Sequence, residues 1–351
     1  MKPSANESLD AKGLRTFKRK TISISSGKLI RTGYLLPGKH IPLLIEPELQ
    51  GLNLVAWAGS NRDLVISLLL KHRALLFRGF EMNAPHHFNE FVKTASNGEL
   101  LEYRDRSSPR HEVGEKIYTS TDYPADQQIA LHNEGTYWLT WPLKIFFSCF
   151  IAPDQGGATP IADCRNVFKR ISPSIRQQLI DKKIMYIRNY NDGFGLTWQT
   201  VFQTDQKAIV EKYCLSNLIE FEWKNGDRLR TKAIRPAIAE HPQTGEVVWF
   251  NHAAFFHVTS LEPTIQETLR REFKEEDLPY NTYYGDGSLI EDDVIGNLRE
   301  AYQEEKVSFP WKQYDVLMLD NMSVSHGREP YKGERRVLVG MAEPYSLTRR
   351  S

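Results

Sequence analysis

The sequence predicts a mainly β protein, a β-barrel or jelly roll with helical insertions. Strand-like runs rich in β-branched and aromatic residues recur from the middle of the chain to its end. Helical and irregular polar segments lie between these runs, without the regular alternation of strand and helix that a doubly wound sheet requires. The 351 residues are enough to bury one large core.

The N-terminal part of the chain predicts a tail, two helices and a strand. Residues 1–20 are polar, and we expect a flexible tail followed by a single domain over 21–351, with helical insertions at about 165–310. Helical apolar spacing predicts helices at 60–72 and 85–98. The run ALLFRGF between them predicts a short buried strand.

The remainder of the chain alternates irregularly between strands and helices. Helices are expected at 173–182 and 204–215, and the segment 261–304 is expected to be mainly helical, with a break at 285–287. Strands are expected at 129–131, 145–151, 185–190, 247–250, 316–319 and 337–341.

Composition excludes several classes of protein. The formal net charge is +1, so no strong basic field exists to hold nucleic acid or an anionic membrane. No apolar run reaches the length of a bilayer span, and the N-terminus has no apolar core of a secretory signal. The three cysteines, Cys149, Cys164 and Cys214, form no CxxC pair, which favours free buried thiols in a reducing compartment. We therefore expect a cytoplasmic protein without a nucleic-acid or membrane partner; its oligomeric state is not indicated.

A candidate metal site begins in the segment Ile129-Ala-Leu-His132-Asn-Glu134. On a strand, residues two apart project from the same face, so His132 and Glu134 can converge on one ion. A second histidine, His326, follows the apolar run YDVLMLD. Two imidazoles and one carboxylate form the facial triad of non-haem iron oxygenases, which leaves positions open for a cosubstrate and dioxygen. An HxE pair alone is weak evidence, and His326 alone would fit a loop histidine, so the interpretation depends on the surrounding residues.

Two further features support a site for a keto diacid. Arg336 begins the run RVLVGM, and its guanidinium suits bidentate pairing with the far carboxylate of 2-oxoglutarate. The adjacent Arg335 is expected to point to the opposite face of that strand. Gly156 and Gly157 permit a close backbone approach, and the Thr159 hydroxyl is placed to hydrogen-bond the same carboxylate. Structural arginines and a bare glycine turn remain the alternatives.

Two long segments resemble a known family. LHNEGTYWLTWPLKIFFSCFIAPDQGGATPIADCR resembles the metal-binding half of the taurine dioxygenase-like (TauD/TfdA) family of 2-oxoglutarate oxygenases. DNMSVSHGREPYKGERRVLVGM resembles its C-terminal half. ALLFRGF, GLTWQTVFQT and HPQTGEVVWFN are also similar to family segments, in the expected order. Within the family, the chain is similar to members of natural-product pathways of the syringomycin-biosynthesis (SyrP-like) type.

The resemblance implies a double-stranded β-helix with helical insertions. It also implies that His132, Glu134 and His326 bind Fe(II), that Thr159 and Arg336 bind 2-oxoglutarate, and that O2 is the co-reactant. The implied reaction is hydroxylation of an unactivated C–H bond of an amino acid or amino-acid-derived intermediate, free or bound to a carrier protein, in antibiotic or other natural-product biosynthesis. Desaturation and cyclisation depend on substrate placement and remain open.

The chain departs from taurine dioxygenase at two positions. Glu134 stands where taurine dioxygenase has aspartate, and the presence of a carboxylate disfavours halogenation, because related halogenases lack it. Four residues beyond the cosubstrate arginine, taurine dioxygenase holds the sulfonate with a second arginine. Counted from Arg336, that position is Gly340, which disfavours a taurine-like substrate.

Substrate contacts and alternative functions are less constrained by the sequence. Arg104 and Arg110 lie upstream of the metal segment and are candidates for binding a substrate carboxylate, and Asn251 is a candidate polar contact. A zinc hydrolase using the same three ligands would leave Arg336 and Thr159 without a role. A non-catalytic barrel that only binds a ligand is the third alternative.

Overall fold

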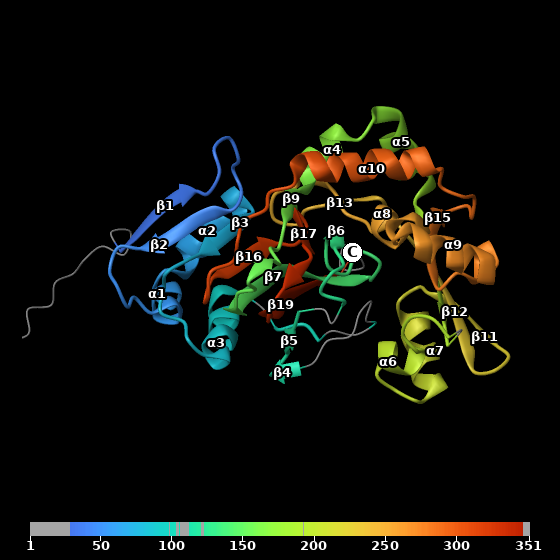
Figure 1. Cartoon of the computed structure of the whole chain (residues 1–351), viewed down its shortest axis with the longest axis horizontal. Coiled ribbons are helices and arrows are strands. Elements are labelled where there is room, and N and C mark those ends of the chain that lie inside the picture. The colour runs from blue at the N-terminus through green and yellow to red at the C-terminus, as the bar shows by residue number, and fades with distance from the viewer. Residues whose placement is uncertain are drawn as a thin grey trace, which may run out of the picture.

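The computed structural model describes residues 29–97, 99–102, 105, 112–120, 123–191 and 193–346 (Figure 1). The expected tail over 1–20 therefore lies outside the described residues, and its separation from one domain over 21–351 stays a prediction. Among the described residues, no helix has both the length and the apolar character that crossing a membrane requires.

The largest sheet has eight strands in the order β1-β2-β3-β16-β7-β19-β5-β4. Its longest strands are β7 and β19, an antiparallel pair in which Val339 lies opposite Phe147. The strands of this sheet are β1 (Ile30–Tyr34), β2 (Leu43–Pro47), β3 (Ala74–Phe77), β16 (Val316–Asp320), β7 (Thr140–Ile151), β19 (Arg336–Ser346), β5 (Ile117–Thr119) and β4 (Glu112–Gly114).

Both faces of this sheet are buried, because alternate side chains of its central strands enter two different apolar clusters. On β19, Val337, Val339 and Met341 pack into the cluster that surrounds the candidate site. Leu338 and Ala342 pack into a second cluster on the other face. Residues of α1 (Leu54–Ser60), α2 (Arg62–His72) and α3 (Pro85–Ala95) fill that second cluster, so these helices cover the face away from the site.

A smaller sheet of three strands carries the candidate site. Its order is β6 (Ile129–His132), β17 (Val324–Arg328) and β9 (Ile161–Asp163), all antiparallel. Two short strand pairs lie apart from it, β8 (Gln155–Gly156) with β18 (Tyr331–Lys332) and β13 (Ile238–Glu240) with β14 (Val247–Trp249).

A third sheet and most of the helices build the outer part of the molecule (Figure 1). The sheet has the order β11-β12-β10-β15. Its strands are β11 (Glu220–Lys224), β12 (Arg228–Arg235), β10 (Ile184–Tyr190) and β15 (Tyr280–Tyr284). The α-helices are α4 (Cys164–Arg170), α5 (Pro173–Lys182), α6 (Trp198–Phe202), α7 (Lys207–Ser216), α8 (Ala253–Phe256), α9 (Pro263–Glu272) and α10 (Asp292–Glu305), with short 3-10 turns η2 (Val258–Ser260) and η3 (Glu275–Asp277).

Most of the expected elements are confirmed, and one segment differs. α2, α3 and α5 form where helical spacing predicts them, and β6, β7, β10, β14, β16 and β19 overlap the expected strands. The segment 261–304 is mainly helical as expected, in α9, η3 and α10, but it also contains the unexpected strand β15, which forms between α9 and α10 and pairs with β10. Its sequence, YNTYY, is aromatic and buried, which suits a strand better than the polar helix expected there.

Candidate metal centre

His132, Glu134 and His326 lie together and are buried. Their candidate ligand atoms all lie within 4.8 Å of one another. Only 9%, 2% and 4% of the three residues, respectively, is exposed, so an ion held by them would be shielded from most of the solvent. Among the residues that the structure describes, this is the group of histidine, cysteine and acidic side chains arranged to share an ion.

The two histidines are brought together by strand pairing. His132 is the last residue of β6 and lies directly opposite His326 on β17, and their ring centroids are 4.5 Å apart. Nδ1 of His132 lies 2.8 Å from the carbonyl oxygen of Ala130, a contact that makes Nδ1 the donor and leaves Nε2 as the ligand nitrogen. Gly327 allows the strands to approach, since a Cβ there would lie 2.6 Å from the carbonyl oxygen of Ile129.

Glu134 is positioned by a turn and not by strand alternation, which corrects the expectation that it shares a strand face with His132. β6 ends at His132, and the following Gly135 adopts φ +74°, where a Cβ would lie 2.3 Å from the Trp138 ring. The amide N–H of Glu134 donates to Oδ1 of Asn321 at 2.8 Å, and Nδ2 of Asn321 donates to the carbonyl oxygen of Glu134 at 2.9 Å. The buried Asn321 therefore fixes the backbone of the carboxylate ligand.

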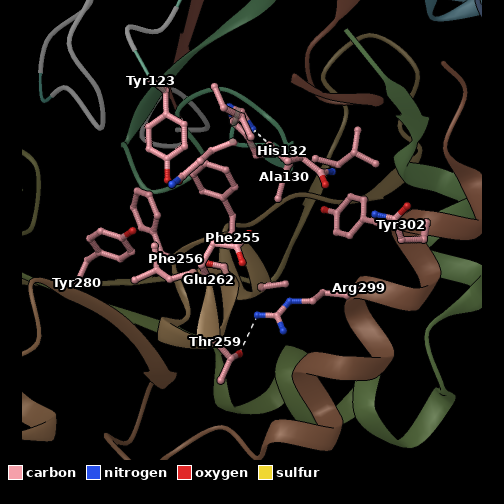
Figure 2. A pocket seen from close by; sticks show the side chains of 18 of the residues that line it. Tyr123, Ala130, His132, Phe255, Phe256, Thr259, Glu262, Tyr280, Arg299 and Tyr302 are labelled. Carbon is pink, nitrogen blue, oxygen red and sulfur yellow. Dashed lines mark hydrogen bonds between the residues drawn. The ribbon is translucent and has the colours of Figure 1, made fainter. Parts of the chain in front are cut away.

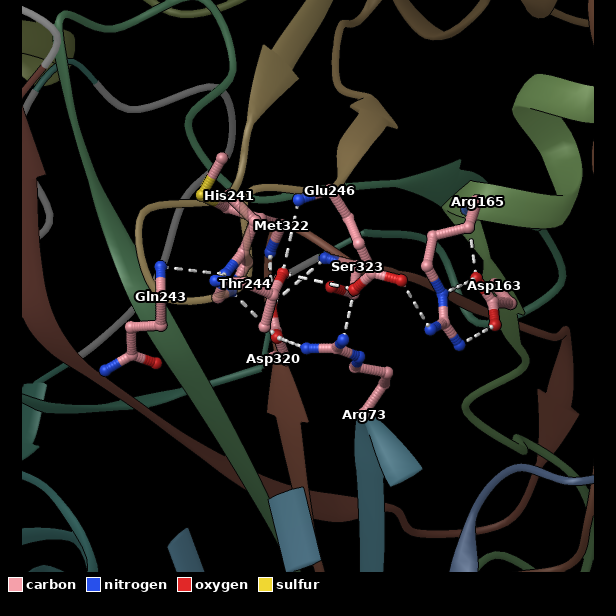
Figure 3. A network of polar contacts seen from close by, with 10 residues as sticks. All are labelled: Arg73, Asp163, Arg165, His241, Gln243, Thr244, Glu246, Asp320, Met322 and Ser323. Carbon is pink, nitrogen blue, oxygen red and sulfur yellow. Dashed lines mark hydrogen bonds and ion pairs between the residues drawn. The ribbon is translucent and has the colours of Figure 1, made fainter. Parts of the chain in front are cut away.

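A polar network holds the turn that carries Asn321 (Figure 3). Oδ1 of Asp320 accepts hydrogen bonds from the amides of Met322 and Ser323, both at 3.1 Å. Its Oδ2 lies 3.0 Å from Nε2 of His241 and 3.4 Å from Nη1 of Arg73. Burial raises the pKa of Asp320, but the contact with His241, the hydrogen bond from the amide of Ser323 and the charge of Arg73 together outweigh it, and the net pKa is lowered. The network thus stabilises a charged carboxylate at the start of the segment that leads to His326.

Arg335, and not Arg336, faces the candidate site. Arg335 donates to the carbonyl oxygen of Gly157 at 2.8 Å, to Oγ of Ser120 at 3.1 Å and to Oγ1 of Thr159 at 3.3 Å. Arg336 is exposed at the start of β19. The expected orientation of the two arginines is wrong because strand alternation places 335 on the face of Val337, which packs in the cluster around the site.

A small cavity lies between Arg335 and the two ligand histidines. His132, His326, Thr159, Arg335 and Val339 are among the residues that line it. Oγ1 of Thr159 also accepts a hydrogen bond from Nε1 of Trp311 at 3.1 Å. Burial, followed by the nearby charge of Arg328, lowers the pKa of Arg335 to about 10.

Because Arg335, and not Arg336, faces the site, the position that is compared with the second arginine of taurine dioxygenase shifts by one residue. Four residues beyond Arg335 is Val339, which lines the small cavity, whereas Gly340 lies on the opposite face, where a Cβ would contact Ile117 and Val92 at 3.1 Å. The residue at the relevant position is therefore apolar, and a sulfonate has no arginine partner there.

A larger cavity of about 460 Å³ adjoins the metal centre (Figure 2). It shares Ile129 and His132 with the small cavity. The ring of Phe255 stacks on His132 with centroids 4.3 Å apart, and Phe256 and Tyr280 add further aromatic surface. Its volume and its wall, which combines aromatic and polar side chains, suit a small organic molecule.

Of the three substrate candidates from the sequence, one is corrected and two cannot be placed. Asn251 is buried, but its Nδ2 donates to the carbonyl oxygen of Ala237 at 2.7 Å and its Oδ1 accepts from the amide of Ala253 at 3.0 Å. Both ends of this amide serve the backbone, so Asn251 is a structural residue and not a substrate contact. Arg104 and Arg110 lie outside the described residues.

Two nearby histidines, His252 and His257, do not belong to the group of three ligands. The His252 ring centroid lies 5.6 Å from that of His132, and its Nδ1 contacts the hydroxyl of Thr136. Burial holds the pKa of His252 well below its ordinary value and lowers that of His257 to about 4, so both imidazoles are neutral at pH 7. Nδ1 of His257 lies 2.7 Å from Oγ1 of Thr259.

The residues present fit a divalent transition metal. Two imidazoles and one carboxylate, with further space beside them in two cavities, match iron(II) sites that keep positions open. Zinc(II) accepts the same donor set. Sequence reasoning missed Asn321 and favoured Arg336 over the inward Arg335. The run DNMSVSH contained Asn321, but an asparagine directly after a strand carries no signal of the loop that it clamps.

Comparison with known proteins gives consistent matches along the chain. The model of the family described as "Taurine catabolism dioxygenase TauD, TfdA family" matches residues 36–342. The dapdiamide synthesis protein DdaC of Enterobacter agglomerans is 40% identical over 277 residues, 79% of this chain and 84% of that protein. A clavaminate synthase-like protein of Arabidopsis thaliana is 30% identical over 287 residues, 79% of this chain and 83% of that protein.

Among solved structures, PvcB of Pseudomonas aeruginosa has a similar fold. Its TM-score is 0.54 at 15% identity, with 91% of this chain and 93% of that chain covered. A further PvcB structure is described as an Fe, alpha-ketoglutarate dependent oxygenase from an isonitrile synthetic pathway. At this level of identity, the likeness concerns the fold alone.

Proposed function

The chain belongs to the taurine catabolism dioxygenase TauD, TfdA family, and from that premise we propose that it hydroxylates an unactivated C–H bond of an amino acid or amino-acid-derived intermediate in natural-product biosynthesis. It is a 2-oxoglutarate-dependent dioxygenase that uses Fe(II), 2-oxoglutarate and O2. The relation to a dapdiamide synthesis protein supports a biosynthetic role.

His132, Glu134 and His326 would hold the iron. The observation that carries this proposal is the direct pairing of the two histidines across β6 and β17, with the carboxylate close by. When bound, iron(II) supplies the redox chemistry that couples oxidative decarboxylation of 2-oxoglutarate to oxygen transfer. Asn321 and the Asp320 network keep the ligand segments in place around it.

Arg335 and Thr159 would bind the far carboxylate of 2-oxoglutarate. Their side chains already touch, and a guanidinium beside a hydroxyl presents several donors to one carboxylate. The small cavity is only about 30 Å³, so the bound diacid extends toward the larger cavity, which shares His132 with it. Arg328, which donates to the carbonyl oxygens of Tyr123 and Gln127, adds positive charge beside this position.

The larger cavity would hold the substrate. Phe255 stacks on one ligand histidine and forms part of the cavity wall, so a molecule bound there lies beside the metal centre and displaces water from it. The double-stranded β-helix that the family implies stays part of the proposal, and it is supported by the small cavity, which strands of both the eight-stranded and the three-stranded sheet line.

Anaerobic addition of iron(II) and 2-oxoglutarate tests the proposed function. We expect the weak visible charge-transfer absorption of an iron(II)–2-oxoglutarate chelate in wild type, and its loss in His326→Ala. Succinate release under air is the second readout. Folded wild-type protein without the absorption and without succinate would contradict the proposal. Hydrolase activity that appears with zinc alone would instead support the zinc alternative.

A further inference from the structure

We propose that Arg299 binds a carboxylate of the substrate, so that the molecule turned over here carries a free carboxylate at the end that lies against α10. This inference rests on the proposed function, because it concerns the substrate of the same cavity. Arg299 projects from α10 at the wall of the large cavity, across from the side that carries His132 (Figure 2). Family membership does not assign it a role.

Arg299 is charged, partly desolvated and only partly satisfied. It is half-buried and donates one hydrogen bond, from Nη2 to Oγ1 of Thr259 at 2.7 Å. Among the described residues, no carboxylate forms an ion pair with it. Burial lowers the pKa of Arg299, and the charge of Asp292 offsets this only in part. A guanidinium has five N–H donors, so most of its hydrogen-bonding capacity remains for a ligand.

The other arginines near the site either have an anionic partner or line the other cavity. Arg188 also lines the large cavity, but its Nη1 lies 2.6 Å from Oδ1 of the buried Asp105, which neutralises it. Arg328 and Arg335 line the small cavity. In the described part of the large cavity wall, Arg299 is therefore the cation without an anionic partner.

The surroundings of Arg299 favour a singly charged planar anion. Oγ1 of Thr259 accepts from Arg299 and lies 2.7 Å from Nδ1 of His257, so the hydroxyl proton can point to the imidazole while the guanidinium is held in place. Glu262 lines the same cavity, and its charge would repel a phosphate dianion more strongly than a carboxylate. A carboxylate also matches the planar fork of arginine.

This arrangement decides between a free and a tethered acid. A carboxyl group joined to a carrier protein as a thioester has lost its charge, and its neutral carbonyl oxygen would leave the desolvated guanidinium without an ionic partner. An aromatic wall formed by Phe255, Phe256 and Tyr280 would receive the apolar body of the substrate. The favoured substrate is therefore a free acid with an apolar or aromatic portion.

Matched acids and amides test the inference by isothermal titration calorimetry. The probes are N-acetyl-L-leucine, N-acetyl-L-phenylalanine and their N-acetyl-alanyl dipeptides, each as the acid and as the C-terminal amide. We expect at least one acid to bind the full-length wild type about tenfold or more tightly than its amide. Arg299→Gln should abolish this preference, and Arg299→Lys should retain part of it, because the charge remains but the planar fork is lost.

Two control variants separate this site from other arginines. Arg271→Gln removes an exposed arginine of α9, and Arg335→Gln removes the arginine of the small cavity. Both should keep the acid preference. Equal affinity of acid and amide in every pair, a preference that survives in Arg299→Gln, or one that disappears only in Arg335→Gln would overturn the inference.

The titrations are run without added metal and repeated anaerobically with iron(II) and 2-oxoglutarate. Binding of the acids requires no turnover, so the preference remains measurable even in a chain that forms no iron chelate. Failure of the proposed function would appear in the chelate absorption alone, and failure of this inference in the acid-to-amide ratio alone.

Discussion

Replacing Arg335 with glutamine should sharply weaken binding of 2-oxoglutarate, whereas the same change at Arg336 should have little effect. The Arg335 guanidinium is held by Gly157, Ser120 and Thr159 and lines the cavity beside both ligand histidines. A hydrogen bond to a charged group contributes about 1.5–3 kcal/mol, which corresponds to roughly a 10- to 150-fold rise in the dissociation constant.

The assay is an anaerobic titration of the iron(II)-loaded protein with 2-oxoglutarate, followed by the visible absorption of the chelate. Arg336 is exposed on the opposite side of β19, so Arg336→Gln is a matched control that removes the same charge one residue away. We expect its dissociation constant to stay within about twofold of wild type, because exposed charges interact weakly with a distant ligand. Loss of affinity in Arg336→Gln with normal affinity in Arg335→Gln would refute the reasoning from strand alternation.

Three further predictions concern stability and the support of the metal ligands. Asn321→Ala should lower the free energy of unfolding by about 2–4 kcal/mol, because buried backbone groups of Glu134 lose their partners. The same change should weaken iron binding in a metal titration. If both the stability and the iron affinity were unchanged, Asn321 would not hold the Glu134 backbone in place. Gly135→Ala should lower the free energy of unfolding, measured in urea, by about 2–4 kcal/mol. The loss should exceed that of Gly226→Ala, because Gly226 has the same φ of +74° but open space around it. Equal losses would show that the backbone angle alone matters. Burial lowers the pKa of His257 from 6.5 to about 4, so this imidazole binds a proton more readily in the unfolded chain. The free energy of unfolding should therefore fall by at most about 3 kcal/mol as pH drops from 6.5 to 4. His257→Gln should flatten this pH dependence, and an unchanged slope would show that His257 does not cause it.

The three metal ligands could be predicted from the sequence because their chemistry is carried by residue type. His132 and Glu134 are two residues apart, and His326 follows a strong apolar strand, so the donor set can be read without knowing the fold. The structure brings all three together. It also shows that a turn, fixed by Asn321, positions Glu134, whereas the sequence suggested strand alternation.

The orientation of the two neighbouring arginines could be decided only by the tertiary structure. Strand alternation predicts that Arg335 and Arg336 point to opposite faces of the sheet. It can tell which face carries the site only where one face of the strand is polar and the other apolar. β19 is apolar on both faces, because Val337 packs toward the site and Leu338 toward the N-terminal helices. The local sequence therefore contained no pattern that could distinguish the two faces.

The sequence by itself determined the kinds of side chain available for the chemistry and most of the elements that carry them. Which of those side chains meet in space was decided by contacts between distant segments. Asn251 is polar and was a candidate substrate contact from the sequence, yet the backbone uses both ends of its amide. Arg299 lies more than 100 residues from His132 along the chain, yet both residues line the larger cavity. Local propensity acts over a few residues, whereas the composition of a cavity depends on how whole sheets and helices pack.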